Sequence, residues 1–469
     1  MNYTFVLFLF LFAMLANAGA QTVPPPAIPS DADIQANLAD RVPDQNAGVG
    51  IVVGIIGPTG RRVIASGNTG TNDSRPVSGD TVFAIGGITK VFTALLLADM
   101  AQRHELALAD PISKYLPKNI QLRESVRRIT LQDLATHTSG LPRDPTNVDA
   151  QDARNAYAEY SPPQLYQFLS GLRLRAAGPA TAEYSNVGYG LLGHLLALRA
   201  RSSYAALVRT RISTPLGMKS TGVNLSPTNN ALWAPAHDPQ QQPLPDLEFD
   251  VLSGAGAMRS TANDLLTLLA GELAYSNSPL SSAMASMLKI RRPTETREFE
   301  NGLGWQVSRV YGREIVQKDG VTLGGDYASF VAFDPNARVG VVVLANAYAP
   351  NGVSDIGLHV LDPRFPLRGM HQREIAVEPA RLDAYVGRYR LSPNVVITVT
   401  RNGSRLFAQM TGQPQYEIFP AGGHSFFYKS FDAQLVFETD ATGRALSVMT
   451  YYGRKSSRAE RIAAPADAK

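Results

Sequence analysis

Three short segments of the sequence hold the side chains best suited to chemistry. Lys90 is the only charged residue between positions 81 and 98. A lysine amine in such apolar surroundings must find partners or lose its proton. The run Tyr184-Ser185-Asn186 brings a phenol and an amide together, and Lys318-Asp319-Gly320 brings a second amine just before a glycine-rich turn. Each segment alone also fits an ordinary structural role: a lysine reaching solvent at a helix end, an asparagine capping a helix, and a turn.

Together, the order and spacing of these segments resemble the active-site elements of serine β-lactamases and penicillin-binding proteins, in which S-x-x-K is followed by Y-x-N and K-T-G. Three further segments are similar to framework segments of the class C β-lactamase branch and its carboxypeptidase and esterase relatives: 134–142, 215–218 and 253–256. The resemblance covers about residues 45 to 350. It implies an α/β (α+β) protein with the β-lactamase/transpeptidase-like fold, a mixed antiparallel sheet flanked by helices beside a helical subdomain.

The resemblance also implies a mechanism and a substrate class. In this family a serine attacks the substrate carbonyl after neighbouring bases remove its proton, and two backbone amides hold the oxyanion. On this chain the general bases would be Lys90 and Tyr184. The positions for substrate and oxyanion binding would be Asn186, Lys318, Gly320, Val321 and the amide of Gly87. The implied substrate is a small-molecule β-lactam or a peptidoglycan stem peptide, with small esters as the runner-up, and no metal or organic cofactor is implied.

Two positions depart from the family pattern. Where the family has its nucleophilic serine, this chain has Gly87, which offers no hydroxyl for an acyl-enzyme. Asp319 replaces the usual threonine or glycine and adds negative charge near a site for anionic substrates. Neither nearby hydroxyl is expected to substitute, because Thr89 lies roughly 200° further round the helix and Ser185 is the middle residue of its turn. His137 is expected to be a framework histidine.

The missing serine leaves three interpretations. The first, which we favour, is a serine hydrolase that has lost only its nucleophile and is inactive as written. The second is a non-catalytic protein that binds D-Ala-D-Ala peptide ends with the remaining amides and cations. The third is residual catalysis by a water in place of the hydroxyl, activated by Lys90 and Tyr184.

Apolar patterns predict the elements that must position these residues. Helices are expected at 88–100, at 187–199, and at 262–273 after a Ser260 or Thr261 cap. Hairpins are expected at 49–64 and 329–346. Strands at both ends with helices between them predict that one sheet joins the two ends of this unit.

The length of 469 residues predicts at least two folding units, and the sequence changes character after Pro363. We expect a catalytic domain at 45–362, a linker at 363–380 and a lipocalin-like β domain at 381–469. Regularly spaced turn residues there predict short strands of a small barrel or sandwich. These lie near 395–400, 405–410, 415–419, 425–429, 433–438 and 446–451.

The N-terminus and the composition predict an exported protein. Residues 1–20 hold a short apolar run and then small residues, as in a signal peptide, and the run is too short to span a bilayer. A Pro-rich stretch then begins a lead-in at 21–44 that we expect to be flexible. The protein would be secreted, periplasmic if the source is a double-membrane bacterium, with no stable membrane span after cleavage. The absence of cysteine excludes disulfides and a thiol nucleophile, and a net charge of +4 with scattered basic residues gives no support to nucleic-acid binding.

Overall fold

The computed structural model of the chain describes residues 27–41, 50–70, 73–148, 155–174, 182–224, 226–238, 242–294, 298–322, 326–346, 353–367, 374–428, 433–452 and 455–463. The expected signal peptide at 1–20 lies outside these residues, as do Val49 and parts of the expected lead-in and linker.

One nine-stranded sheet forms the centre of the molecule, and its neighbouring strands pair antiparallel. In spatial order its strands are β3 (Asp73–Pro76), β2 (Gly60–Gly70), β1 (Gly50–Gly57), β13 (Val339–Ala345), β12 (Ala328–Asp334), β11 (Arg313–Val321), β10 (Gln306–Val310), β9 (Glu300–Asn301) and β8 (Arg292–Pro293). The pairing of β1 with β13 confirms that the sheet joins the two ends of this unit.

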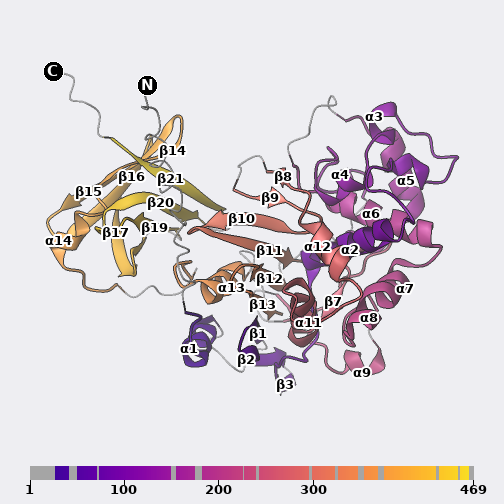
Figure 1. The fold of residues 1–469 in the computed structure, drawn as a ribbon, viewed down its shortest axis with the longest axis horizontal. Helices are drawn as coiled ribbons and strands as arrows, with labels where there is room; N and C mark the ends of the chain where they lie inside the picture. The colour runs from indigo at the N-terminus through magenta and orange to yellow at the C-terminus, as the bar shows by residue number, and fades with distance from the viewer. Residues whose placement is uncertain are drawn as a thin grey trace, which may run out of the picture.

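The sheet is covered by helices on both faces, each over its own apolar core (Figure 1). The core on one face joins sheet residues to helices α2 (Thr89–Gln102), α6 (Asn186–Ala200), α11 (Ala262–Glu272) and α12 (Ser281–Met287), of which α11 packs directly on strands β1 and β13. The other face packs against α1 (Asp31–Arg41) and α13 (Ser354–Leu361). Strand alternation explains the division, since neighbouring residues of β12 such as Phe330 and Val331 belong to different cores.

The helical subdomain is built from short elements around α2 and α6, at the right of Figure 1. These are η2 (Ile112–Lys114), α3 (Glu124–Arg127), α4 (Leu131–Ala135), α5 (Pro162–Gly171), α7 (Tyr204–Val208), η4 (Arg209–Ser213), α8 (Thr214–Leu216), α9 (Pro227–Asn230) and α10 (Ser253–Gly256). Two-stranded pairs join β4 (Phe83–Ala84) to β7 (Arg259–Ser260) and β5 (Ala236–His237) to β6 (Pro243–Leu244). The three predicted helices coincide with α2, α6 and α11 to within two residues at each end, and Thr261 is the residue that caps α11.

A closed barrel of eight strands follows a short helix, α14 (Pro379–Leu382). Its strands are β14 (Gly387–Ser392), β15 (Val395–Asn402), β16 (Arg405–Met410), β17 (Gln415–Gly422), β18 (Ser425–Phe427), β19 (Ala433–Thr439), β20 (Ala445–Tyr452) and β21 (Lys455–Ile462). Aromatic rings fill the interior, with Tyr385 in contact with Phe426 and Phe437. The six expected strands are present, and β14 and β21, which were not predicted, pair with each other and close the barrel.

The barrel touches the sheet domain at the turn between β10 and β11, which reaches toward it in Figure 1. Tyr311 in this turn packs against Val436, Met449 and Tyr451 of the barrel. Strands β10 and β11 therefore contact the barrel through the turn that joins them. At its other end, β11 carries Lys318 toward the helical subdomain.

The expected flexible lead-in over 21–44 is wrong for Asp31–Arg41, which forms helix α1. Ile34 and Leu38, four residues apart, lie on one face of that helix and are buried in the core beneath the sheet. Arg41 adds an ion pair to Asp355 of α13. The segment is thus a docked part of the domain.

Leu38→Ala should therefore lower the free energy of unfolding of the sheet domain by about 2–4 kcal/mol, because it leaves a cavity under a buried helix. The exposed Gln35→Ala on the same helix serves as the control and should change stability by less than about 0.5 kcal/mol. Urea unfolding followed by tryptophan fluorescence reports on this domain, since Trp233 and Trp305 both lie in it. Equal midpoints for the two variants would contradict the docked position of α1.

Candidate active site

Gly86 and Gly87 form a turn that presents the start of α2 to strand β11. The turn is a short 3-10 helix, η1 (Gly86–Ile88), and Gly86 has φ of +44°, a backbone conformation that glycine adopts without strain. Helix α2 follows at once, and its first twelve residues are buried. This explains the missing polar face of the helix, which is surrounded by the sheet and by other helices.

The Lys90 amine lies inside the protein, with the side chain only 1% exposed. Its Nζ donates to Asn186 Oδ1 at 3.0 Å and to the Ala255 carbonyl oxygen at 2.8 Å. Lys90 was expected either to find partners or to lose its proton, and the structure gives it two hydrogen-bond partners. The alternative of a lysine that reaches solvent is wrong.

Burial lowers the pKa of Lys90 well below its usual value, and the charges of Lys318 and Arg143 lower it further. A neutral amine has two N–H donors and one lone pair. The bonds to Asn186 and Ala255 use both donors, so the lone pair remains to take a proton from a nearby hydroxyl. The role of Lys90 as a general base stays a prediction from the family resemblance, and these two bonds leave it possible.

The ring of Tyr184 is the meeting point of the site. The Nζ atoms of Lys90 and Lys318 lie 4.9 and 5.0 Å from its centroid, and the guanidinium carbon of Arg143 lies 5.2 Å from it. His137 stacks on the ring with centroids 4.7 Å apart. The Tyr184 ring is therefore surrounded by three basic side chains and one imidazole.

Helix α6 begins at the Tyr184-Ser185-Asn186 segment, but Asn186 is not its cap. Ser185 is the cap: its Oγ accepts from the Gly188 amide at 2.9 Å and donates to the Pro142 carbonyl at 2.7 Å. Ser185 is better placed for this role because the first helical residue is Asn186 itself, which leaves the asparagine amide available to the site. The suggested capping role of Asn186 is therefore wrong.

The Asn186 amide is held in one orientation. Its Oδ1 accepts from Lys90, while its Nδ2 donates to Asp144 Oδ1 at 2.8 Å and lies 3.5 Å from Tyr157 Oη. Tyr157 also donates to Asp144. Sequence reasoning missed Asp144, Tyr157 and the Ala255 carbonyl, although 253–256, which includes Ala255, was noted as a framework segment.

Strand β11 supplies Lys318, Gly320 and Val321. β10 stops pairing with β11 at Gln306–Gln317, so Lys318–Val321 is paired with β12 alone in the part of the chain that is described. A Cβ atom on Gly320 would lie 2.9 Å from the Gly87 amide nitrogen and 2.3 Å from the Ile85 carbonyl oxygen. Only glycine fits there, and its absent side chain lets the strand approach the Gly87 turn.

A side chain at position 87 would point toward the tyrosine hydroxyl. An ideal Cβ built on Gly87 lies 3.4 Å from Tyr184 Oη and 2.7 Å from the Asp319 carbonyl oxygen. A hydroxyl one bond further would be within hydrogen-bonding reach of Tyr184, after a small shift of β11 away from the close carbonyl contact. The structure thus gathers Gly87, Lys90, Tyr184, Asn186 and Lys318, while their catalytic and binding roles stay predictions.

Other candidate side chains lie elsewhere or have structural partners. Thr89 Oγ1 accepts from the Met258 amide at 3.1 Å, so this hydroxyl is held away from position 87. Asp319 precedes Gly320 on the strand, and by alternation its side chain faces away from Lys318 toward the barrel side of the sheet. Within the described residues, no three His, Asp or Glu side chains gather as a metal site requires, and no helix is long and apolar enough to cross a membrane.

Comparison with known proteins agrees with this geometry. The sequence model described as "Beta-lactamase" matches residues 36–361, which is more than half of the chain. The chain therefore belongs to the beta-lactamase family. A second model, described as "Domain of unknown function (DUF3471)", matches residues 371–461, which include all of the barrel except its last residue, Ile462.

Individual relatives include both peptidases and β-lactamases. The chain is 28% identical over 339 residues to the D-alanyl-D-alanine-carboxypeptidase/endopeptidase AmpH of Escherichia coli K12, covering 69% of this chain and 86% of that protein. It is 25% identical over 403 residues to penicillin-binding protein 4* of Bacillus subtilis, covering 78% and 84%. The crystal structure of a class C β-lactamase from Rhodobacter sphaeroides matches at 28% identity with a TM-score of 0.59, covering 71% of this chain and 97% of that one. The expected β-lactamase/transpeptidase-like fold and the resemblance to the class C branch are confirmed.

His137 supports the site in a way that depends on its charge. Its Nδ1 accepts from the Ser185 amide at 3.0 Å, which only an unprotonated ring nitrogen can do, and burial lowers its pKa well below the usual value. The unfolded chain therefore takes up a proton near pH 6.5 that the folded chain does not. Stability should be unaffected by His137 above about pH 6.5 and should fall below it, by up to about 1.4 kcal/mol per pH unit.

His137→Asn should make the loss of stability between pH 7 and pH 5 less steep. Asparagine tolerates the left-handed backbone at this position, where φ is +61°, and has no proton to gain in this range. The measurement is the unfolding free energy of both proteins at each pH. His194 and His237, whose pKa values burial also lowers, are present in both proteins and cancel in the comparison. Parallel pH profiles would show that His137 is protonated in the folded state.

Proposed function

We propose that this chain carries the acyl-transfer site of a serine hydrolase of the β-lactamase and penicillin-binding-protein type, acting on β-lactams or D-Ala-D-Ala-type peptides. With Gly87 at the nucleophile position, the chain as written binds such substrates without forming an acyl-enzyme. The observation that carries the proposal is the direction of the Gly87 Cβ position, 3.4 Å from Tyr184 Oη and next to the helix that bears the buried base Lys90.

The chemical step assigned to the site with a serine at position 87 balances as follows. The serine oxygen attacks the substrate carbonyl carbon, forming a C–O bond, and its proton passes to the Lys90–Tyr184 pair. The backbone amides of residues 87 and 321 stabilise the oxyanion. The C–N bond then breaks and the leaving nitrogen receives the proton. A water molecule finally attacks the acyl ester and releases the acid and the serine.

Several further parts of the proposal concern the whole protein. We place the mature protein outside the cytoplasm, in the periplasm if the source has two membranes, because of the apolar run followed by small residues at 1–20. We take the barrel as the counterpart of the lipocalin-like domain appended to many relatives. Small esters remain the alternative substrate class, and a binding protein for peptidoglycan peptides remains the alternative function.

The alternative function rests on one observation. Lys90, Tyr184, Asn186 and Lys318 remain gathered although the nucleophile position is glycine, so the site can still present cations and amides to a ligand. A protein selected only for binding would need this arrangement as much as a hydrolase does.

Gly87→Ser should restore acyl transfer. A penicillin should add its full mass to the variant, detected by intact-mass spectrometry, and a chromogenic cephalosporin should be hydrolysed. The unaltered chain should do neither, because it has no hydroxyl at this position. The rate difference should be at least about 10³-fold, as for other lost nucleophiles.

The matched control is Gly87→Ala, which has the same Cβ and forces the same shift of the Asp319 carbonyl but has no hydroxyl. It should stay inert. Adduct formation by the alanine variant, or by neither variant, would contradict the proposed acyl-transfer site.

In the Gly87→Ser background, the further change Lys90→Met should slow acylation by about 10²- to 10⁴-fold, because it removes the base while keeping an apolar chain of similar length. The control is Lys118→Met, which removes an exposed lysine and should leave the rate unchanged. Both rates are measured as the growth of the penicillin adduct with time. Equal rates for the two double variants would exclude Lys90 as the base.

A further inference from the structure

The amide of Asn186 can in principle be placed in two ways. Turning it by 180° about its last side-chain bond exchanges Oδ1 and Nδ2 with little change in shape. Lys90 does not select one of these orientations, because burial favours its neutral form. A neutral amine can donate an N–H to Oδ1, or accept an N–H from Nδ2 with its lone pair. The orientation is therefore decided on the side of the amide that faces away from Lys90.

Two oxygen atoms, from Asp144 and Tyr157, face the nitrogen of the Asn186 amide. Asn186 Nδ2 lies 2.8 Å from Asp144 Oδ1 and 3.5 Å from Tyr157 Oη. Tyr157 donates its own proton to the same carboxylate oxygen, so its hydroxyl oxygen is left as an acceptor. A carboxylate has no hydrogen to donate. With the amide turned round, its oxygen would face two oxygens and both of these contacts would be lost.

The loop that bears Asp144 is docked on the start of α6. The carbonyl oxygen of Arg143 accepts from the Asn186 backbone amide at 2.7 Å, which places the next residue, Asp144, beside the Asn186 side chain. The second carboxylate oxygen of Asp144 lies 3.6 Å from Arg143 Nε. Tyr157 is 3% exposed, and its ring packs on Phe249 with centroids 5.7 Å apart. Both oxygens that face Asn186 are therefore held in place.

The orientation of Asn186 decides whether the lone pair of Lys90 is free. In the observed orientation Lys90 Nζ donates to Asn186 Oδ1 and to the Ala255 carbonyl oxygen, and these two bonds use both N–H groups of a neutral amine. With the amide turned round, Asn186 Nδ2 would donate to the lone pair. The amine could then no longer take a proton from a hydroxyl at position 87.

We propose that Asp144 is a positioning residue for acyl transfer, which keeps the Asn186 oxygen turned toward Lys90 so that the Lys90 lone pair stays free. The inference rests on the proposed function, since it takes Lys90 as the base. Tyr157 acts through Asp144, because it donates to the carboxylate oxygen that accepts from Asn186.

The charge of Asp144 has a second and separate effect on Lys90. Burial lowers the pKa of Lys90 most, and the neighbouring cations lower it further, while the carboxylate of Asp144 raises it. The charges that act in one or the other direction are those of Lys318, Arg143, Asp319 and Asp144. An experiment on Asp144 must therefore separate its hydrogen bond from its charge.

Two substitutions in the Gly87→Ser background make this separation. Asp144→Asn removes the charge but keeps an oxygen that accepts from Asn186, whereas Asp144→Leu removes both at similar size. The rate of penicillin adduct formation is measured by intact-mass spectrometry over a range of pH, and it should rise to a plateau as Lys90 loses its proton. Both variants should move this rise to lower pH, since both lose a charge that raises the pKa of Lys90.

The plateau rate tests the proposal. Asp144→Leu should lower it by about tenfold or more, because the amide loses the hydrogen bond that fixes its orientation. Asp144→Asn should keep it within about threefold, because the acceptor oxygen remains. Tyr157→Phe leaves the carboxylate in place and should lower the plateau by only about two- to threefold.

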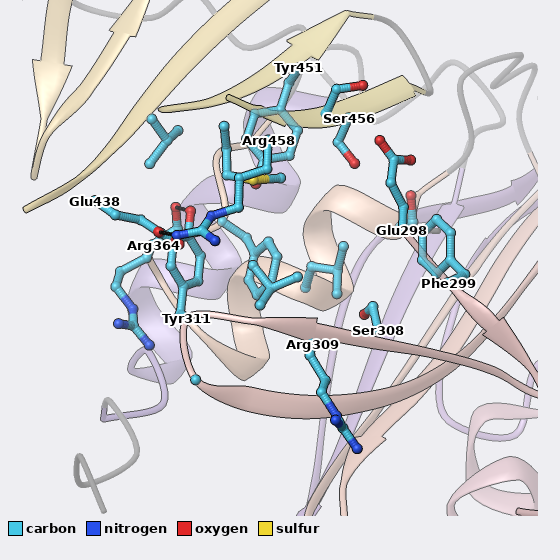
Figure 2. Close-up of a pocket in the computed structure, with 18 of the residues that line it drawn as sticks. Glu298, Phe299, Ser308, Arg309, Tyr311, Arg364, Glu438, Tyr451, Ser456 and Arg458 are labelled. Carbon is cyan, nitrogen blue, oxygen red and sulfur yellow. Dashed lines mark hydrogen bonds and ion pairs between the residues drawn. The ribbon is translucent and has the colours of Figure 1, made fainter. Parts of the chain in front are cut away.

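The controls remove carboxylates that make no contact with Asn186. Glu159→Leu changes an exposed residue of the segment that bears Tyr157. Glu298→Gln changes a residue of the cavity between the sheet domain and the barrel, which has a volume of about 1820 Å³ and shares no lining residue with the Lys90 cluster. Figure 2 shows Glu298 with Phe299 on one side of this cavity and Glu438 on the other. Both controls should keep the plateau rate and the position of the pH-dependent rise.

Equal plateau rates for Asp144→Asn and Asp144→Leu would overturn the inference, whether both are lowered or both are unchanged. Charge or packing alone would then account for the result. Urea unfolding checks that each variant is folded, and Asp144→Ala, which also lacks an acceptor, takes the place of a leucine variant that is not. If the Gly87→Ser protein itself forms no adduct, the proposed function fails and this inference fails with it. If it forms the adduct and only the expected difference between asparagine and leucine is missing, the proposed function stands.

Discussion

The site depends on the burial of a single amine. Lys90 enters the interior on a helix that is covered on all sides, and its nitrogen is bound by the Asn186 side chain and the Ala255 carbonyl. Removing an ammonium from water is costly unless it is paired or neutral. Three elements, α2, α6 and α10, must therefore keep their relative positions to within hydrogen-bonding tolerance. Two further contacts hold the side chains around the Lys90 amine: His137 stacks on Tyr184, and Asp144 accepts a hydrogen bond from Asn186.

The second constraint is the position of strand β11, because its two faces contribute residues to two different parts of the molecule. Gly320 permits close approach to the Gly87 turn, and Lys318 projects toward the Tyr184 ring from the same face. The opposite face carries Gln317 and Asp319 to the space beneath the barrel. The barrel packs on the β10–β11 turn through Tyr311. It therefore lies on the face of β11 opposite to the one that carries Lys318 to the candidate active site.

Much of this arrangement could be predicted from the sequence. The apolar neighbours of Lys90 indicated a buried amine, and the patterns at 187–199, 262–273 and 329–346 gave the correct elements. The partners could not be predicted in the same way, because Ala255 contributes only a backbone carbonyl from 165 residues away. The face on which Asp319 lies follows from strand register, and the sequence placed its charge near the substrate without indicating the cavity.

Helix α1 and strand β21 were not predicted from the sequence, for the same physical reason. Among the helix α1 residues whose burial is described, Ile34 and Leu38 are the two buried ones, and the helix follows a Pro-rich stretch that favours an extended chain. Strand β21 carries charged residues on its outer face and is stabilised by pairing with β14, far away in the sequence. Both were weak local patterns that became ordered elements through tertiary contacts.

The central claim is that the site is built for acyl transfer and lacks only the attacking oxygen. The most direct measurement is a crystal structure of the Gly87→Ser variant soaked with a penicillin. We expect continuous density from the introduced side chain to the opened lactam, with the acyl oxygen between the amides of residues 87 and 321 and the penicillin beside Tyr184. An acyl group attached to another residue, or an empty site in a variant with unchanged packing around Lys90, would contradict it.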